Sequence, residues 1–191
     1  MLCATMGDRS TVRRICVFCG SHLGSRPAFV AAAEAVGKEL AARGLTLVYG
    51  GGSVGLMGVV ANAALAANGE VVGVIPRDLF AAEVAHRGIS RLYEVGSMHE
   101  RKALMADLAD AFLVLPGGLG TFDELIEMLT WNLLGIHRKP IGLLDLDGFF
   151  APLLAQLDRA IADGFLQADS SAQPLRSTTV PDLIDRLQRG W

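Results

Sequence analysis

Residues 45–58 read LTLVYGGGSVGLMG, and residues 111–124 read AFLVLPGGLGTFDE. Each stretch is an apolar run, then a glycine-rich turn, then the start of an amphipathic segment. Short apolar runs bounded by turns are typical of strands buried on both faces, and apolar spacings of three and four residues predict helices. Two strand–turn–helix units of this kind predict a parallel α/β sheet.

The same alternation extends outward along the chain. Gly44 and Gly69 each follow a helical stretch and precede a strand, where a left-handed helix cap is wanted. We therefore predict a single-domain, Rossmann-like, doubly wound and mostly parallel sheet with helices on both faces, spanning residues 15–191. Further strands are expected at 15–19, 71–75 and 141–144, and helices at 28–42, 56–68, 98–108, 122–134, 150–163 and 182–189.

Length and composition limit the class of protein. The 191 residues suit one domain, and 51% hydrophobic residues with a net charge of −3 indicate neither disorder nor a nucleic-acid-binding surface. Residues 1–14 lack a signal-peptide run, so we expect a flexible N-terminal segment and a cytoplasmic protein. Residues 45–69 carry no charge, but their glycines and Asn62 argue against a membrane span.

Cys16 and Cys19 form a C-x-x-C pair inside the first predicted strand. Residues three apart in a strand point to opposite faces, so we expect neither a metal nor a redox role for this pair. Three cysteines in all give no disulfide framework.

Both glycine-rich turns follow strands, and ligands of open α/β sheets bind beyond the carboxyl ends of strands. Glycine lets backbone amides approach an anion, and the following helix presents unpaired amides, so we expect phosphate there. In the first turn the candidate phosphate-binding residues are Gly50, Gly51, Gly52 and Ser53. This turn matches G-x-G-x-x-G, but the strand 71–75 ends in Pro76 and Arg77 rather than in the acid that binds NAD ribose. Tight turns alone remain the alternative explanation.

Two helix starts, Ser97 to Glu100 and Thr121 to Glu124, match the S/T-x-x-E capping box. Capping alone explains Glu100, whereas Glu124 follows a turn that should face an anion and is better suited to the sugar of a ligand. Arg101 and Lys102 lie near the positive end of their helix, so they are either a solvated basic pair or a pair that an anionic ligand compensates. No histidine-rich set accompanies these acids, so no metal is expected.

The motifs MHERK (98–102) and PGGLGTFDE (116–124) resemble the paired signatures M-H-x-R-K and P-G-G-x-G-T-x-x-E of the LOG (Lonely Guy) family. Residues 17–21, 49–58 and 131–137 extend the resemblance over most of residues 15–165. It implies a hydrolase that releases the free base and ribose 5-phosphate from N6-substituted adenosine 5'-monophosphates, and from AMP, without a cofactor. The sequence does not identify which base is preferred.

Residue roles also come from this resemblance. It implies that Arg101 and Glu124 are catalytic. The implied substrate contacts are Glu83, Arg101, Lys102, Gly118, Leu119, Gly120, Thr121, Phe122, Asp123, Glu124 and Thr130. Glu83 lies in a stretch, 80–88, that matches the family poorly.

Three alternatives remain open. A non-catalytic nucleotide or cofactor carrier is one, because this fold can bind without reacting. Similar chains are often labelled lysine decarboxylases, but none of Lys38, Lys102 and Lys139 suits a Schiff base with pyridoxal phosphate. The apolar stretch 131–136 is either core or a subunit interface, and the resemblance favours a homodimer.

Overall fold

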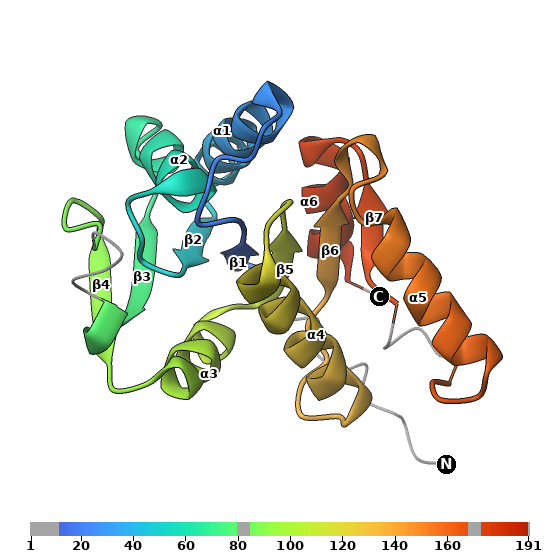
Figure 1. Cartoon of the computed structure of the whole chain (residues 1–191). Helices are drawn as coiled ribbons and strands as arrows, with labels where there is room; N and C mark the ends of the chain where they lie inside the picture. The colour runs from blue at the N-terminus through green and yellow to red at the C-terminus, as the bar shows by residue number, and fades with distance from the viewer. Residues whose placement is uncertain (1–11, 80–84, 168–172, 191) are drawn as a thin grey trace, which may run out of the picture.

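The computed structural model describes residues 12–79, 85–167 and 173–190. Its seven strands form one sheet in the order β4-β3-β2-β1-β5-β6-β7, and all neighbouring pairs are parallel (Figure 1). The predicted α/β sheet is therefore confirmed. The strands are β1 (Arg14–Phe18), β2 (Thr46–Tyr49), β3 (Val71–Pro76), β4 (Arg91–Val95), β5 (Ala111–Val114), β6 (Ile141–Leu144) and β7 (Leu175–Ser177).

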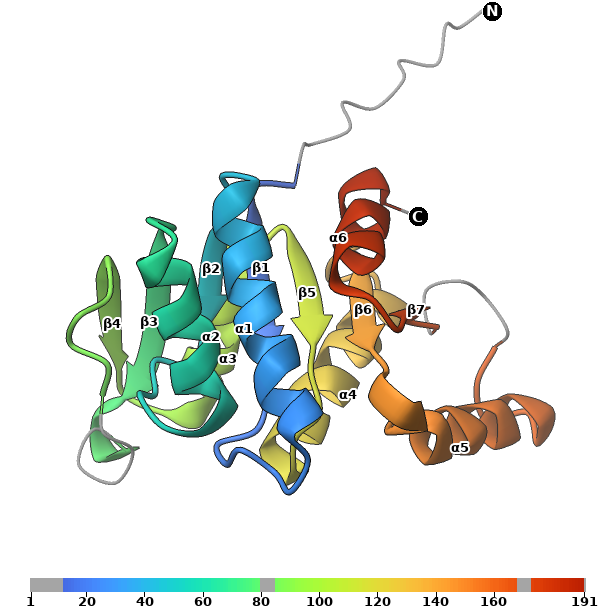
Figure 2. The same cartoon turned by 90° about the horizontal axis from the view of Figure 1, so that it is seen from above.

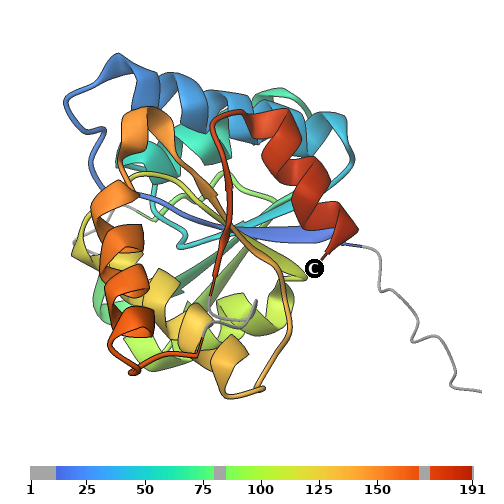
Figure 3. The same ribbon diagram turned by 90° about the vertical axis from the view of Figure 1, so that its right-hand side faces the viewer.

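Helices cover both faces of this sheet. Helices α1, α2 and α6 lie on one side of the strands and α3 and α4 on the other (Figure 3). Helix α5 has no buried residue and projects from the rest of the fold (Figure 2). The described helices are α1 (Pro27–Ala42), α2 (Gly55–Ala66), α3 (Met98–Leu108), α4 (Leu119–Leu133), α5 (Ala151–Ala162) and α6 (Val180–Arg189), with 3-10 turns η1 (Arg77–Leu79) and η2 (Leu146–Gly148).

The strand order places a switch point at the centre of the sheet. The chain builds β1 to β4 toward one edge and then returns to add β5 on the other side of β1. The amide of Gly20 after β1 donates to the carbonyl of Pro116 after β5, at 3.2 Å. In doubly wound sheets the ligand crevice opens between two such loops.

Two strands, β4 and β7, were not predicted. β4 lies at the sheet edge and has no fully buried residue, and β7 has only three residues. Neither shows the apolar run that marks a buried strand. The first strand also begins earlier than expected, because the amides of Arg13 and Arg14 donate to the carboxylate of Asp110 at 2.9 and 2.8 Å.

The predicted glycine caps differ in outcome. Gly44 has a φ of +65°, which confirms a left-handed position after α1. After α2 the left-handed residue is Asn68, with a φ of +59°, so the prediction for Gly69 is wrong. Gly69 instead permits close packing, because a Cβ there would lie 2.7 Å from the Cβ of Ala41.

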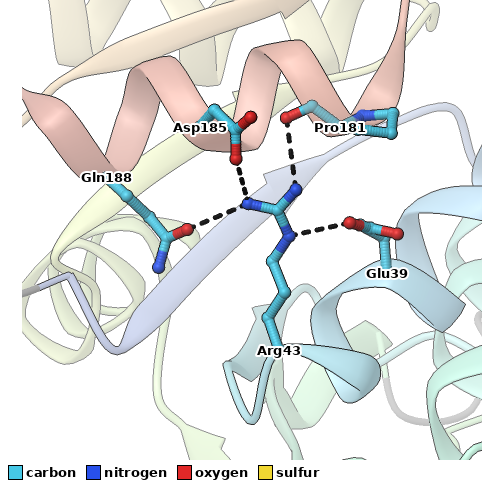
Figure 4. A network of polar contacts seen from close by, with 5 residues as sticks. All are labelled: Glu39, Arg43, Pro181, Asp185 and Gln188. Atoms are coloured by element: carbon cyan, nitrogen blue, oxygen red, sulfur yellow. Dashed lines mark hydrogen bonds and ion pairs between the residues drawn. The ribbon is translucent and has the colours of Figure 1, made fainter.

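Helix α6 is fixed to α1 by one side chain, Arg43 (Figure 4). Its guanidinium donates to Glu39 at 2.7 Å, to Gln188 at 3.0 Å and to the carbonyl of Pro181 at 3.4 Å, and it also bonds Asp185. The hydrogen bonds to Asp185 and Glu39 raise the pKa of Arg43 although burial opposes the charge. In the part of the chain that the structure describes, no helix combines the length and apolar character needed to cross a membrane.

Candidate active site

A cavity of about 380 Å³ lies at the switch point, beyond the carboxyl ends of β1 and β5. Its walls come from the loop after β1, from α2 and α3, and from the amino end of α4. The lining residues are Cys19, Ser21, His22, Met57, Met98, Arg101, Gly118, Leu119, Gly120, Thr121, Asp123 and Glu124. Pockets of a few hundred cubic ångströms are typical of small-molecule sites.

A second cavity of about 220 Å³ adjoins the first, because Ser21, His22 and Gly118 line both. Its other walls are largely apolar and include Phe29 and Phe149. The two rings are in edge contact, with centroids 5.8 Å apart. The switch point therefore offers two joined compartments, one rich in charged groups and one rich in apolar groups.

The amino end of α4 opens into the larger cavity. The N-cap residue is Gly118, which has no side chain to cap the helix. The first intrahelical bond runs from the amide of Phe122 to the carbonyl of Gly118, at 3.1 Å. The amides of Leu119, Gly120 and Thr121 stand in the first turn of α4, where backbone amides have no partner within the helix. Three amides and the positive end of the helix dipole are an arrangement suited to an anion.

The structure corrects the capping-box interpretation of Glu124. Helix α4 begins three residues before Phe122, at Leu119, so Thr121 lies inside the first turn and Glu124 in the second. Both are buried, at 3% and 9% exposure, and both line the larger cavity. Glu124 is therefore a carboxylate of the site rather than a cap.

The capping interpretation of Glu100 is confirmed. The hydroxyl of Ser97 accepts from the amide of Glu100 at 3.2 Å, as the N-cap of α3. The Glu100 carboxylate turns back and accepts from the amide of Gly96 at 2.7 Å. This places Glu100 at the helix end, and it does not line the larger cavity.

Arg101 is a buried cation, with 6% of its surface exposed. Its Nη2 donates to the carbonyl of Gly50 at 3.0 Å, and its Nη1 lies 3.7 Å from the sulfur of Met98. A Cβ at position 50 would lie 1.8 Å from Nη2, so only glycine lets the guanidinium take this place. The Gly50 turn after β2 thus holds Arg101 at the cavity wall.

The remaining residues predicted for the Gly50 turn do not line either cavity. Gly51 accepts from the amide of His86 at 2.9 Å, and Gly52 forms an isolated antiparallel bridge with Ala85. Ser53 lies beside the start of α2, whose Leu56 amide donates to the carbonyl of Gly20 at 3.0 Å. At α2 the anion-binding position is therefore partly filled by the chain itself.

Lys102 joins α3 to α4. Its ammonium forms ion pairs with Asp123 at 2.9 Å and with Glu127 at 3.0 Å. Burial opposes its charge, but the hydrogen bonds to Asp123 and Glu127 raise the pKa of Lys102. Lys102 does not line the larger cavity, whereas its neighbour Arg101 does.

Cys16 and Cys19 are both buried free thiols, and they pack into the two different hydrophobic clusters on either side of the sheet. This agrees with the prediction that they point to opposite faces. Burial, and then the negative charge of Glu124, raise the pKa of Cys19 far above its ordinary value. Cys19 therefore lines the cavity as a neutral thiol.

Two predicted contacts, Phe122 and Thr130, do not line the larger cavity. Phe122 is half-buried and stacks on Phe149 with centroids 6.3 Å apart, so it packs against a ring that lines the second cavity. Thr130 is exposed, and its hydroxyl donates to the carbonyl of Ile126 at 2.7 Å. Glu83 lies outside the described residues.

Ser21 and His22 were missed by the sequence analysis, which assigned phosphate binding to the turns after β2 and β5. The signal that could have found them is the glycine in CGSH (19–22), directly after the first strand. That first strand–helix loop borders the switch point in doubly wound sheets. Among the described residues, no group of histidine, cysteine and acidic side chains could hold a metal ion.

Fold and site together define a Rossmann-like α/β protein with a buried arginine and a buried glutamate in the wall of one cavity at a helix amino end. A family model described as "Possible lysine decarboxylase" matches residues 57–187. The probable cytokinin riboside 5'-monophosphate phosphoribohydrolase LOGL1 of Oryza sativa subsp. japonica is 47% identical over 97% of this chain and 83% of its own. The corresponding LOG7 enzyme of Arabidopsis thaliana is 46% identical over 94% and 83%. The chain belongs to this LOG family.

A solved structure shares the fold at lower similarity. The molybdenum cofactor binding protein of Rippkaea orientalis aligns with a TM-score of 0.68 at 22% identity, covering 92% of this chain and 95% of its own. Identity at this level supports the common fold alone. It does not support a carrier function for this chain.

Proposed function

We propose that this protein hydrolyses the N-glycosidic bond of cytokinin riboside 5'-monophosphates and of AMP, releasing the free base and ribose 5-phosphate. One observation carries the proposal: Arg101 and Glu124, which lie on different helices, are both buried in the wall of one cavity at the amino end of α4. The names of its relatives supply the bond and the substrate class.

The amino end of α4 binds the 5'-phosphate in this proposal. The amides of Leu119, Gly120 and Thr121 are donors in a fixed arrangement, and the helix dipole favours negative charge there. Fixing the phosphate away from the reacting carbon holds the ribose in one geometry, which lowers the entropic part of the barrier. The phosphate candidates Gly50, Gly51, Gly52 and Ser53 then serve the site through Arg101.

Glu124 acts on the ribose. Breaking the bond between C1' and N9 builds positive charge on the sugar, and a carboxylate near C1' stabilises it. The same carboxylate accepts a proton from the attacking water. Arg101 supplies a fixed positive charge in the same cavity, which stabilises the negative charge that develops on the departing purine.

The other predicted contacts divide into two groups. Lys102 and Asp123 hold α3 against α4 through their ion pair, and so fix the separation of Arg101 and Glu124. Glu83 and Thr130 stay predicted substrate contacts. Thr130 faces outward on α4, so we expect it to reach a substrate bound by a second copy of the chain.

We further propose a homodimer formed through α4. Leu119, Ile126 and Leu133 are seven residues apart on this helix and are exposed by 88%, 39% and 39%. Leu134 and Ile136 follow directly and are exposed by 68% and 62%. Contiguous exposed apolar residues mark interaction surfaces, and this one adjoins the anion site.

The two described cysteines are free thiols, which supports a cytoplasmic location.

The test is to incubate the protein separately with AMP and with isopentenyladenosine 5'-monophosphate and to identify the products by mass. Release of free base and ribose 5-phosphate is expected from both. Recovery of both nucleotides unchanged would favour a carrier and would reject the proposed hydrolysis. Equal turnover of the unphosphorylated nucleosides would reject the assigned phosphate site.

The decarboxylase in the matched family's description has no support from the three lysines. Lys38 is exposed and pairs with Glu34, and Lys102 is held by two carboxylates. Lys139 donates to the carbonyl of Ala106 at 2.6 Å, and it does not line the cavities at the switch point. A Schiff-base lysine must be free to reach its carbonyl partner.

A further inference from the structure

His22 is a side chain of the site to which the proposed function assigns no role. It lies in the loop after β1 and lines both joined cavities. The hydroxyl of Ser21 lies 3.3 Å from its Nδ1. The nitrogen left for a ligand is therefore Nε2, on a residue that borders both compartments.

The proposed reaction needs a proton donor. When the C1'–N9 bond breaks, both electrons move to the purine, and protonation of a ring nitrogen makes the purine a better leaving group. Arg101 cannot supply this proton, because a guanidinium stays protonated in proteins. Its charge assists the departure, but the transferred proton must come from another group.

The other groups that line the larger cavity are unsuited to this task. Cys19 holds its proton far too strongly, because burial and Glu124 raise its pKa. The carboxylate of Asp123 is already engaged, because it accepts a hydrogen bond from the ammonium of Lys102 at 2.9 Å. Glu124 is required as a carboxylate toward the ribose, and the hydroxyls of Ser21 and Thr121 are weak acids.

Among the described residues, His22 is the one imidazole in the walls of the two cavities. Imidazole is the side chain whose ordinary titration lies nearest to neutral pH, so it can both hold and release a proton under working conditions. A general acid performs best when its own titration lies near the working pH. The charged groups that share its cavity are Arg101 on α3 and Asp123 and Glu124 on α4.

We propose that His22 is the catalytic acid that protonates the departing base. The inference rests on the proposed hydrolysis. As the C1'–N9 bond breaks, Nε2 gives its proton to a purine ring nitrogen and the imidazolium becomes neutral imidazole. The oxygen of water bonds to C1', and the proton lost by that water goes to Glu124. Solvent then returns a proton to His22 and takes one from Glu124, so no other reactant is needed.

The experiment compares two leaving groups in the wild type and in His22→Gln. AMP needs a proton on its departing base, whereas 4-nitrophenyl ribofuranoside 5-phosphate departs as a stable nitrophenolate anion without one. For AMP we expect kcat to fall by roughly 10²–10⁴-fold, the usual contribution of a general acid. For the nitrophenyl substrate we expect a far smaller fall, because no proton is transferred to that leaving group.

His99→Gln is the matched control, because His99 is an exposed histidine on the neighbouring α3 that lines neither cavity. It should turn over both substrates as the wild type does. An equal loss on both substrates in His22→Gln would mean that His22 binds the phosphate or the ribose, and would overturn the proposal. Unchanged turnover of AMP in His22→Gln would overturn it as well.

A failure of the proposed hydrolysis can be distinguished from a failure of the role proposed for His22. If the wild type releases base from AMP and Glu124→Gln does not, the hydrolysis stands and the leaving-group comparison decides on His22 alone. If the wild type releases neither base nor nitrophenol, the proposed function fails and the role of His22 fails with it.

Discussion

Glu124 reaches the cavity because of where its helix begins. With Leu119 as the first residue of α4, Thr121 and Glu124 are three residues apart within the helix. Residues at this spacing share one face, and here that face is buried against the site. The carboxylate is thus held by a regular element, which fixes its direction better than a loop does.

Glu124→Gln should lower base release by roughly 10²–10⁴-fold, because the amide neither carries negative charge nor accepts the proton of water. Its melting temperature should change little, because the side-chain volume is kept. A product assay and a melting curve on the same preparation measure both effects.

Glu100→Ala is the contrasting variant. It removes the acceptor for the Gly96 amide and should lower the free energy of unfolding by about 1 kcal/mol while turnover stays normal. Normal turnover in Glu124→Gln, or lost turnover in Glu100→Ala, would reverse the roles given to the two acids.

His137 makes stability depend on pH. Burial, with a smaller effect of Lys139, lowers its pKa from 6.5 to about 4. The unfolded chain then takes up a proton at a higher pH than the folded chain does. The free energy of unfolding should therefore fall as the pH drops from about 6.5 to about 4, and this contribution should level off below that range.

Urea unfolding at several pH values between 4 and 7 measures this dependence. His137→Gln cannot titrate and should show a shallower fall than the wild type, whereas His99→Gln should follow the wild type because His99 is exposed. An identical slope in His137→Gln and the wild type would assign the dependence to other groups.

Helices α1 and α6 are coupled through Arg43, which bonds two residues besides Glu39 and Asp185 (Figure 4). Its side chain is only 22% exposed. Several bonds from one planar, partly buried guanidinium are stronger than an isolated surface pair. The amphipathic α6 is thereby held over β6, where Leu183 and Leu187 pack against Gly142.

Arg43→Met should lower the free energy of unfolding by about 1–3 kcal/mol, because it leaves carboxylate and carbonyl acceptors without their donor. Lys38→Met is the matched control, because Lys38 is exposed and its ion pair with Glu34 spans 3.5 Å. Its free energy of unfolding should be nearly the same as that of the wild type. Urea titrations of both variants give the values. Equal losses in the two would mean that the network adds no more than a surface pair.

The central elements could be predicted from the sequence, and the edges could not. β1, β2, β3, β5 and β6 are apolar runs because helices cover both of their faces, whereas β4 lies at an edge without a fully buried residue and β7 is short. The start of α4 was misplaced because its N-cap is a glycine, which leaves no side-chain signature, and Thr121 mimics one. His22 lines the site because β1 and β5 are neighbours, and its one local signal was the glycine in CGSH (19–22) after the first strand.

The complete fold brings distant parts of the chain to one place. Arg101 and Gly50 are 51 residues apart, and the loops after β1 and β5 meet through Gly20 and Pro116. Such contacts follow from the strand order alone. Both cavities lie where that order reverses, so the architecture determines the location of the site and the local residues determine its chemistry.

The proposed dimer is tested by Leu134→Asp. A charge at this exposed position beside α4 should be tolerated by the monomer and should prevent two apolar surfaces from meeting, so the variant should elute at monomer mass. Phe165→Asp is the matched control, because Phe165 is 85% exposed but lies beyond α5. Light scattering over a concentration series gives the masses. Separation of the dimer by Phe165→Asp alone would move the interface to α5.

Gly50 leaves the space that the Arg101 guanidinium occupies, so a substitution at position 50 affects both the activity and the abundance of the protein. In a library selected for activity, substitutions of Gly50 would be as harmful as substitutions of Glu124, although Gly50 lines neither cavity. A library selected for abundance would also respond to position 50, because any side chain there displaces a buried cation. Only the two scores taken together would separate residues that do the chemistry from residues that make room for it.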